Sequence, residues 1–342
     1  MSFDISVLDL VPVPSGTAPS QALADTLALA ETAEKAGYKR YWISEHHSMP
    51  AIASASPEVL LSRVGALTQH IRIGSGGIML PNHAPMRVAE HFKALEALYP
   101  GRVDLGLGRA PGSDARANRA IHARSGEHFV AMLDEMLALS EDSYPVDHPY
   151  HGVRVMPEDV GLPPIWILGS SGASAGFAAD RGFGYSFASH FSPMAPDAAL
   201  NEYRRQFQPS AQFQAPHTIL GVSVICADTE AQAQHLAQTV DLMWLRLRKG
   251  EFAALPSPEE AAAYPYSELE RAAVSDNRAR HVIGTPEQVA DRLSSLAEHT
   301  QASELMIVSN IHDQAARLRS YERVAEALST ERLRSPMATR AG

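Results

Sequence analysis

Two kinds of hydrophobic pattern alternate along the chain. Short, nearly continuous apolar runs begin near residues 3, 40, 71, 102, 164, 184, 217 and 304, and nearly all are followed by stretches in which apolar residues recur every three or four positions. The short runs are typical of strands in a parallel sheet, and the longer period is typical of amphipathic helices. These units predict an α/β fold, namely a (β/α)₈ TIM barrel with insertions. A doubly wound open sheet is the alternative.

The clearest strand–helix–strand unit lies at 71–112. Two apolar runs, 71–80 and 103–107, flank a helical pattern that begins at Pro85 and stops before Gly101. Proline suits the first turn of a helix, and a Pro-Gly pair ends one. The apolar positions of this helix would lie against the sheet, so we expect chemistry at the glycine-rich ends of the two runs.

Glycines and one arginine stand at these ends, namely Gly76, Gly77, Gly108 and Arg109. Glycines let a flat or anionic ligand approach the backbone, because no Cβ stands in the way. Arg109 offers a rigid set of donors that suits a phosphate. Taken singly, the glycines could equally be turn residues and the arginine a surface charge. The segment is not a dinucleotide-binding fingerprint, since Pro111 stands where the third glycine would be needed.

Two segments break the strand–helix rhythm. Residues 142–163 contain several turn-prone clusters and one short β-like run, HGVRV, and are expected to form an insertion. Residues 249–280 are rich in proline, alanine and charge and form the longest stretch without a clear period. Such a segment is expected to be a lid, a capping segment or disordered, and we interpret it as a lid. The chain 1–342 is thus predicted to be a single barrel domain.

Composition narrows the class of partner. The formal net charge of −10 at pH 7 argues against nucleic acid and against an anionic membrane surface as partners. The N-terminal residues lack a basic region and a cleavage site, and no apolar run approaches membrane-spanning length. The single cysteine, Cys226, lies in a strand-like run and is expected to be a buried thiol without a catalytic role. We therefore expect a cytoplasmic protein without disulfides.

In a barrel of this kind, functional residues lie at the carboxyl ends of the strands. The residues expected there are Asp9, Leu10, Glu45, His46, His47, Gly76, Gly77, Asn82, Gly108, Arg109, Gly169, Ser170, Ser171, Ser174, Ser189, His190 and Asn310. The turn LGSSGAS offers the hydroxyls of Ser170, Ser171 and Ser174 at the start of a helix, where free N–H groups favour a phosphate. An ordinary serine N-cap is the alternative.

Two adjacent histidines close the second strand. Because neighbouring side chains on a strand point to opposite faces, His46 and His47 are not expected to share a metal ion. Beyond Glu45 no second acidic cluster follows, so we predict no metal site. One histidine should face the barrel mouth, and His46 is the candidate general acid or base. A structural histidine at the strand end is the alternative.

Several motifs, in a fixed order, carry a likeness to a known family. They are EHH after the second strand, the block IGSGGIMLPNHAPMRVAEHFKALEALYPGRVDLGLGRAPGSD, then LGSSGASAGFAADRG and VIGTPEQVADRL. With these motifs the chain resembles the bacterial luciferase-like flavin-dependent monooxygenases over essentially its whole length. The long block together with EHH is the most specific part of the likeness.

The resemblance implies an activity, a cofactor and partners. Family members use a (β/α)₈ barrel, reduced FMN from a separate flavin reductase, and O₂ to oxygenate a small organic substrate, and they are usually dimers. On this likeness Arg109, Ser170, Ser171 and Ser174 would bind the FMN phosphate, with Gly108 and Gly169 among the cofactor-binding residues. Gly76 and Gly77 would face the isoalloxazine, at a step where the family often has a non-proline cis peptide. His46 would match the histidine that acts as acid or base.

The chain departs from the luciferases at two positions. Gly108 stands where luciferases carry a reactive cysteine, and Ser170 stands where they carry an acidic residue. Light emission and the use of long-chain aldehydes therefore do not follow from the likeness, whereas flavin binding does. An F420-dependent hydride-transfer enzyme of the same fold and a non-catalytic flavin-binding subunit are the alternatives. The retention of EHH, Arg109 and the serine turn argues against the second. A homodimer is expected.

Overall fold

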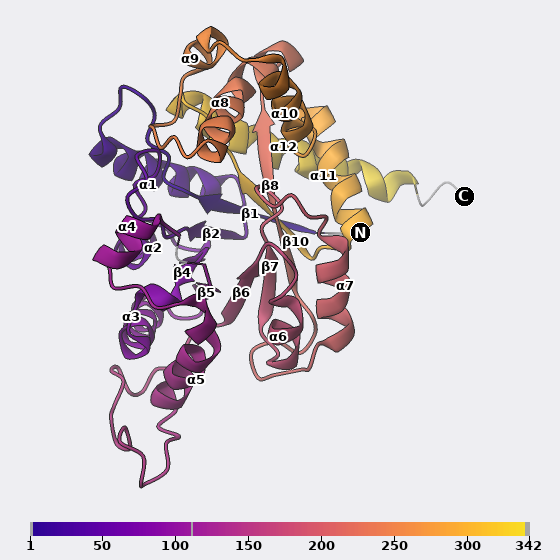
Figure 1. The fold of residues 1–342 in the computed structure, drawn as a ribbon. Coiled ribbons are helices and arrows are strands. Elements are labelled where there is room, and N and C mark those ends of the chain that lie inside the picture. The colour runs from indigo at the N-terminus through magenta and orange to yellow at the C-terminus, as the bar shows by residue number, and fades with distance from the viewer. Residues whose placement is uncertain (1–2, 111, 339–342) are drawn as a thin grey trace.

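The computed structural model describes residues 3–110 and 112–338. Within them, eight parallel strands form a closed barrel (Figure 1). In ring order they are β1 (Asp4–Asp9), β2 (Arg40–Ile43), β3 (Arg72–Ser75), β5 (Val103–Gly108), β6 (Ile165–Gly169), β7 (Gly184–Phe187), β8 (Thr218–Cys226) and β10 (Glu304–Val308). The ring closes because β10 pairs with both β8 and β1. The predicted (β/α)₈ barrel is confirmed, and the open sheet is wrong.

Helices cover the outside of the barrel. They are α1 (Pro19–Lys35), α2 (Pro57–Leu67), α3 (Pro85–Leu98), α5 (Phe129–Ser140), α6 (Ala175–Asp180), α7 (Asp197–Gln206), α8 (Glu230–Arg248), α11 (Pro286–Thr300) and α12 (Gln314–Ala338). The helices α2, α3 and α11 begin with proline, whose missing N–H would have no partner in the first turn. Their buried faces form one large core with the strands.

The unit at 71–112 has the predicted order, but its first strand is divided. The apolar run forms β3, then β4 (Ile78–Met79), then the 3₁₀ turn η1 (Leu80–Asn82). The division falls at the peptide between Gly76 and Gly77, which is cis, as the resemblance predicted. The carboxyl end of β3 is thereby separated from β4, which pairs with β5 alone.

Several short elements were not predicted. They are α4 (Ala115–Ala120), η2 (Gly126–His128), α9 (Pro258–Ala263), α10 (Glu268–Arg278) and β9 (Val282–Gly284). Two of them, α9 and α10, lie in 249–280, the segment without a clear period. Each begins with a capping box, Ser257 with Glu260 and Ser267 with Glu270. These Ser-x-x-Glu patterns mark helix starts that the missing apolar period concealed.

Some predicted boundaries were wrong. Strand β2 ends at Ile43, so His46 and His47 lie in the loop beyond it rather than on the strand. The helix expected to open within the turn LGSSGAS begins only at Ala175. The serines and glycines before it favour a turn over the first helical residues.

The segment 142–163 contains no helix or strand among its described residues, so the β-like run HGVRV is not a strand. Gly152 within it has φ +74°, a value that suits a turn and not a strand. Figure 1 shows this segment as a projection beyond α5. Its status as an insertion, and the single barrel domain, stay predictions.

Buried charges close the amino-terminal end of the barrel. Arg40 of β2 donates to Asp104 of β5 at 2.7 Å and to Glu304 of β10 at 2.7 and 2.9 Å. Burial opposes the charge on Glu304, but Arg40 outweighs that effect and lowers the pKa of Glu304 to about 2. The network ties three strands together below the site.

Two further predictions concern the chain as a whole. None of the helices in the described residues is both long enough and apolar enough to cross a membrane. Cys226 is buried, and burial raises the pKa of its thiol to about 12. A thiol in that state is a poor nucleophile at neutral pH, as predicted.

Candidate active site

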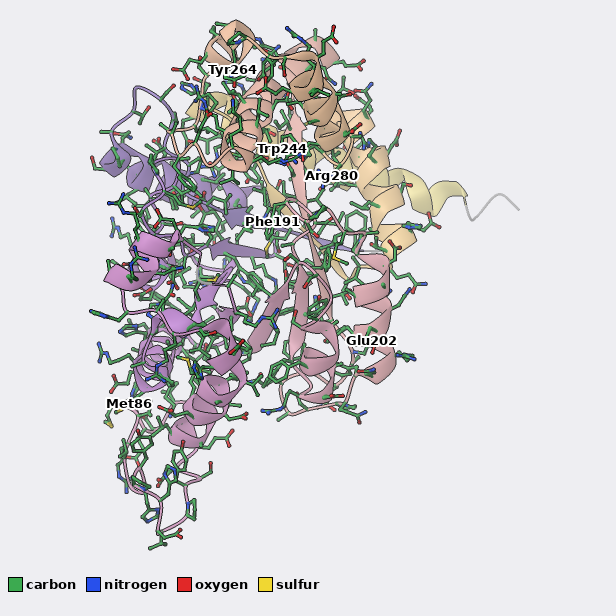
Figure 2. The ribbon with its side chains drawn as sticks, in the orientation of Figure 1. Met86, Phe191, Glu202, Trp244, Tyr264 and Arg280 are labelled. Carbon is green, nitrogen blue, oxygen red and sulfur yellow. The ribbon has the colours of Figure 1, made fainter. Side chains whose placement is uncertain are left out.

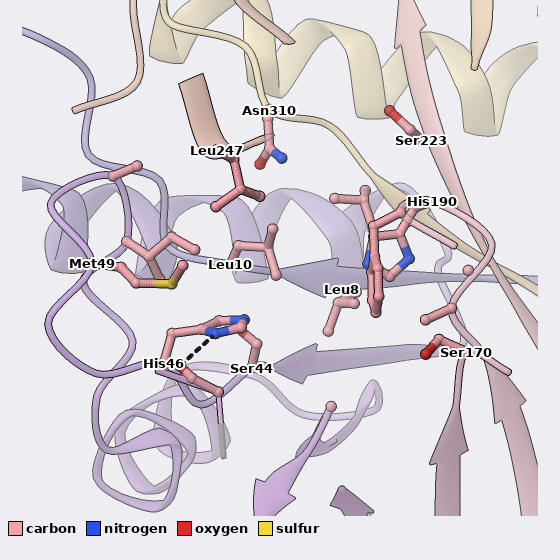
Figure 3. A pocket seen from close by; sticks show the side chains of 18 of the residues that line it. Leu8, Leu10, Ser44, His46, Met49, Ser170, His190, Ser223, Leu247 and Asn310 are labelled. Atoms are coloured by element: carbon pink, nitrogen blue, oxygen red, sulfur yellow. Dashed lines mark hydrogen bonds between the residues drawn. The ribbon is translucent and has the colours of Figure 1, made fainter. Parts of the chain in front are cut away.

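A cavity of about 460 Å³ lies at the carboxyl ends of the barrel strands (Figure 3). Its lining comes from residues at or just after β1, β2, β3, β5, β6, β7, β8 and β10, and from α8. Figure 3 shows His46, Ser170, His190 and Asn310 around the same space. The closed ring therefore gathers side chains that are far apart in the sequence.

Most of the residues predicted from the sequence meet in this cavity. The lining contains His46, Gly76, Gly108, Arg109, Gly169, Ser170, Ser171 and Ser174, together with Leu10, His190 and Asn310. Gly77 does not line it, and a Cβ there would meet the carbonyl oxygen of Gly106 at 2.7 Å, so this glycine lies against β5. Asp9 is also absent from the lining. It is fully buried and forms an ion pair with Arg317 at 2.6 Å.

Arg109 and the serine turn border the same space. The Arg109 residue is exposed, and its guanidinium forms no ion pair or hydrogen bond within residues 3–110 and 112–338. Gly126 lets the neighbouring 3₁₀ turn approach, since a Cβ there would lie 2.9 Å from the Arg109 carbonyl oxygen. The cavity thus has a cation without a protein counter-ion. That arrangement suits an anionic ligand group.

The serine turn is tightly packed. A Cβ on Gly169 would collide with the Ser174 hydroxyl, and Gly172 has φ +82°, so glycine is needed at both positions. The Ser192 hydroxyl donates to the Ser170 carbonyl oxygen at 2.6 Å and anchors the turn to the loop after β7. Helix α6 starts at Ala175 and spans only six residues, so its dipole adds little. The hydroxyls are the stronger feature of this turn.

His46 has a defined tautomer. Its Nδ1 lies 3.1 Å from the carbonyl oxygen of Gly112, which can only accept a hydrogen bond. Burial lowers the pKa of His46, so the neutral ring dominates at pH 7. A neutral ring that donates from Nδ1 has an unprotonated Nε2. His46 can therefore accept a proton or a hydrogen bond on the cavity side.

Glu45 holds the loop that carries His46. Each of its carboxylate oxygens accepts two hydrogen bonds, from His47 Nε2 at 2.8 Å and Asn82 Nδ2 at 2.9 Å, and from Met79 N at 2.8 Å and His83 Nε2 at 2.9 Å. Burial alone would raise its pKa, but the hydrogen bonds from both histidines lower the pKa to about 2. Thus Glu45 and His47 are structural, and the adjacent His46 is the histidine at the cavity.

Other residues of the cavity were not predicted from the sequence. Ser223 on β8 and His281 before β9 line it, and no local pattern predicts either. Three apolar residues of α8, Val240, Met243 and Leu247, also line it, together with Trp244. Phe191 and Trp244, two members of the lining, are labelled in Figure 2.

Three neutral imidazoles face this cavity. Burial lowers the pKa of His190 to about 3, and burial together with the nearby Arg280 and Arg278 lowers the pKa of His281 to about 4. His46 is the third. No group of three or more His, Cys, Asp or Glu side chains that could hold a metal ion occurs in the described parts of the chain.

Comparison with known proteins settles the family. A profile of the family described as "Luciferase-like monooxygenase" matches residues 1–302. The chain belongs to this family. The family predicted from the motifs is confirmed, and with it an enzyme of the flavin-dependent monooxygenase and oxidoreductase class.

Similar proteins cover nearly the whole chain. A "Luciferase-like monooxygenase" of Escherichia coli strain K12 is 40% identical over 320 residues, which are 93% of this chain and 94% of the relative. An "N-acetyl-S-alkylcysteine monooxygenase" of Bacillus subtilis is 32% identical over 330 residues, 95% of this chain and 98% of the relative. The crystal structure of apo-MsnO8 has a TM-score of 0.86 at 35% identity and covers 96% of this chain and 99% of its own.

More distant structures share the fold and differ in cofactor. The oxygenating constituent of 3,6-diketocamphane monooxygenase from Pseudomonas putida, in complex with FMN, has a TM-score of 0.71 at 20% identity and covers 96% of this chain and 98% of its own. An F420-dependent secondary alcohol dehydrogenase has a TM-score of 0.67 at 15% identity and covers 96% of this chain and 99% of its own. Likeness at this level concerns the fold alone.

Proposed function

We propose that the enzyme is an FMN-dependent monooxygenase that uses reduced flavin and O₂ to oxygenate a small organic substrate. The observation that carries the proposal is that Arg109 and the hydroxyls of Ser170, Ser171 and Ser174 border one cavity. A phosphate monoester is well matched by one guanidinium and several hydroxyl donors. The FMN complex of the diketocamphane enzyme supports this cofactor on the same fold.

The residues present fit such a cofactor. Arg109 forms no ion pair with any described residue, so its guanidinium is available to a phosphate in the cavity. Beyond this polar end, the lining is mainly apolar, with Leu8, Met79 and Leu168 among its members. A flat aromatic ring system is expected to favour such a surface.

When bound, reduced flavin supplies the electrons that activate O₂. The protein's own contribution follows from its side chains. Arg109 and the serine turn would hold the phosphate, and the apolar walls would limit the access of water. His46 Nε2 would accept a proton from a group in the cavity. The segment 249–280 would act as the lid, because Phe252 and Ala253 line the cavity rim while α9 and α10 lie outside it.

Replacement of Arg109 tests the phosphate site. We expect Arg109→Ala to weaken FMN binding by about 2–4 kcal/mol, or roughly 30- to 900-fold, because a charge-assisted phosphate contact is lost. Arg116→Ala is the matched control, since Arg116 is exposed on α4 and does not line the cavity. Titration of both variants, followed by flavin fluorescence, measures the effect. Equal affinities for the two variants would remove Arg109 from the site.

The choice of FMN over F420 has its own experiment. The enzyme is titrated with FMN and with F420, and binding of each is followed by the fluorescence of the cofactor. We expect FMN to bind and F420 not to bind, whereas binding of F420 alone would overturn the FMN assignment. The separate flavin reductase, the homodimer and the cytoplasmic location remain predictions, to be checked by activity with an added reductase, by mass in solution and by fractionation.

A further inference from the structure

A chain of hydrogen bonds runs from α10 to the cavity wall. Arg280 Nη2 donates to Asn277 Oδ1 at 2.8 Å, and this contact fixes the orientation of the amide. Asn277 Nδ2 therefore faces His281, and it lies 3.3 Å from His281 Nε2. An amide nitrogen can only donate, so His281 Nε2 is an acceptor.

The state of His281 determines the next bond. Burial, with Arg280 and Arg278 nearby, lowers the pKa of His281 to about 4, so the ring is neutral at pH 7. A neutral ring with an unprotonated Nε2 carries its hydrogen on Nδ1. Nδ1 lies 3.1 Å from the Ser223 hydroxyl oxygen and donates to it. The Arg280 guanidinium thus determines which atom donates and which accepts in each hydrogen bond from Asn277 to Ser223.

The hydrogen of the Ser223 hydroxyl is not used in these hydrogen bonds. Its oxygen accepts from His281, and its own O–H has no acceptor among residues 3–110 and 112–330. The residue is buried and lines the cavity. Because buried hydroxyls nearly always form hydrogen bonds, the O–H is available to a molecule in the cavity.

The residues around Ser223 limit the kind of molecule that can bind there. The neighbouring His190 is neutral, and a Cβ on Gly221 would lie 2.7 Å from its Nδ1, so glycine on β8 makes room for the ring. The charged residues of the lining are Arg109, Arg246 and Glu251, and none of them is hydrogen-bonded to Ser223 or His281. The α8 face with Met243 and Trp244 adds apolar surface. An uncharged acceptor attached to an apolar body fits this wall.

We propose that Ser223, oriented by Arg280, Asn277 and His281, is a substrate-positioning hydrogen-bond donor, and that the substrate is an uncharged molecule with a carbonyl-type oxygen on a mainly apolar body. This inference rests on the proposed function, because it assigns the substrate of the same cavity. Ser223 acts on binding and orientation, and the proton chemistry remains with His46.

The first test concerns the hydrogen-bond polarity and needs no flavin. In protein labelled with ¹⁵N at histidine, we expect His281 to appear as the neutral Nδ1–H tautomer, with its signals assigned by their loss in His281→Gln. In Asn277→Asp the side chain cannot donate, so a proton should appear on Nε2. A wild-type His281 with its hydrogen on Nε2, or an unchanged tautomer in Asn277→Asp, would overturn the proposal.

The second test concerns the ligand. Cyclohexanone and methylenecyclohexane have similar shapes, and only the ketone has an acceptor oxygen. Binding of both to the wild-type enzyme and to Ser223→Ala is measured by titration, with and without FMN. We expect Ser223→Ala to weaken binding of the ketone about 3- to 10-fold and to leave the hydrocarbon unchanged.

Ser44→Ala is the matched control. The Ser44 hydroxyl also lines the cavity, but Ser54 Oγ donates to the Leu10 carbonyl oxygen and so accepts from Ser44. The hydroxyl hydrogen of Ser44 already forms a hydrogen bond with Ser54. Ser44→Ala should therefore not change the difference in affinity between the ketone and the hydrocarbon. Equal effects of Ser223→Ala on both probes, or no preference for the ketone in the wild type, would overturn the proposal. A loss of FMN affinity with unchanged ketone preference would assign the hydroxyl to the cofactor and also overturn it. Failure of the wild type to bind FMN would instead contradict the proposed function.

Discussion

Glu45 should stabilise the folded protein strongly, because its carboxylate holds the loop that carries His46. In Glu45→Gln one carboxylate oxygen becomes an amide nitrogen, and two of the four donors around the group lose their acceptor. The pKa of Glu45 falls from 4.5 to about 2 on folding, which corresponds to about 3 kcal/mol of stability at neutral pH. We expect Glu45→Gln to lower the free energy of unfolding by about that amount.

The pH dependence of this difference follows from the sign of the shift. A lowered folded-state pKa stabilises the protein fully above the unfolded value of 4.5, and the contribution is lost as the pH falls towards 2. About 2 kcal/mol of it should be gone at pH 3. Urea unfolding of the wild type and Glu45→Gln at pH 7 and pH 3 measures both values.

Glu298→Gln serves as the control, because Glu298 is exposed on α11 and outside the cavity. A cost of Glu45→Gln below about 1 kcal/mol at pH 7, or a cost that does not change with pH, would refute the role given to the carboxylate.

Three further predictions concern the cavity histidines. His46→Ala should leave FMN affinity intact and slow turnover about 100-fold, because a proton acceptor is lost, and loss of flavin binding would instead make the residue structural. Because burial lowers the pKa of His46, the acid limb of wild-type turnover should lie below pH 6.5, and a limb above that value would contradict the assignment. The pKa of His281 is about 4 in the folded state and 6.5 in the unfolded chain. As the pH falls, the unfolded state therefore binds a proton before the folded state does. The free energy of unfolding should therefore fall as the pH drops from 6.5 to 4, by up to about 3 kcal/mol, and His281→Gln should reduce this fall.

The barrel could be predicted because the apolar periods are local and strong. The parts of the site that were predicted have local signals too. Glycines at strand ends, an arginine after β5 and a serine turn before α6 are visible in short stretches of sequence. Each alone had an ordinary structural explanation, and only the closed ring brings Arg109 and Ser170 to one cavity.

The parts that were missed depend on long-range contacts. Ser223 and His281 are 58 positions apart, and their bond requires β9 to pair with β8. The helix α10, which supplies Asn277, was hidden because it is mostly polar and Asn277 is its one buried residue, so no buried apolar face marks it. Likewise, the apolar face of α8 does not reveal whether it packs against a strand or borders a cavity.

A crystal structure of the enzyme with bound FMN would show which residues hold the phosphate. We expect the phosphate to lie within hydrogen-bonding distance of the Arg109 guanidinium and of the hydroxyls of Ser170, Ser171 or Ser174. A phosphate bound elsewhere on the molecule, with Arg109 and the serine turn left in contact with solvent, would contradict it.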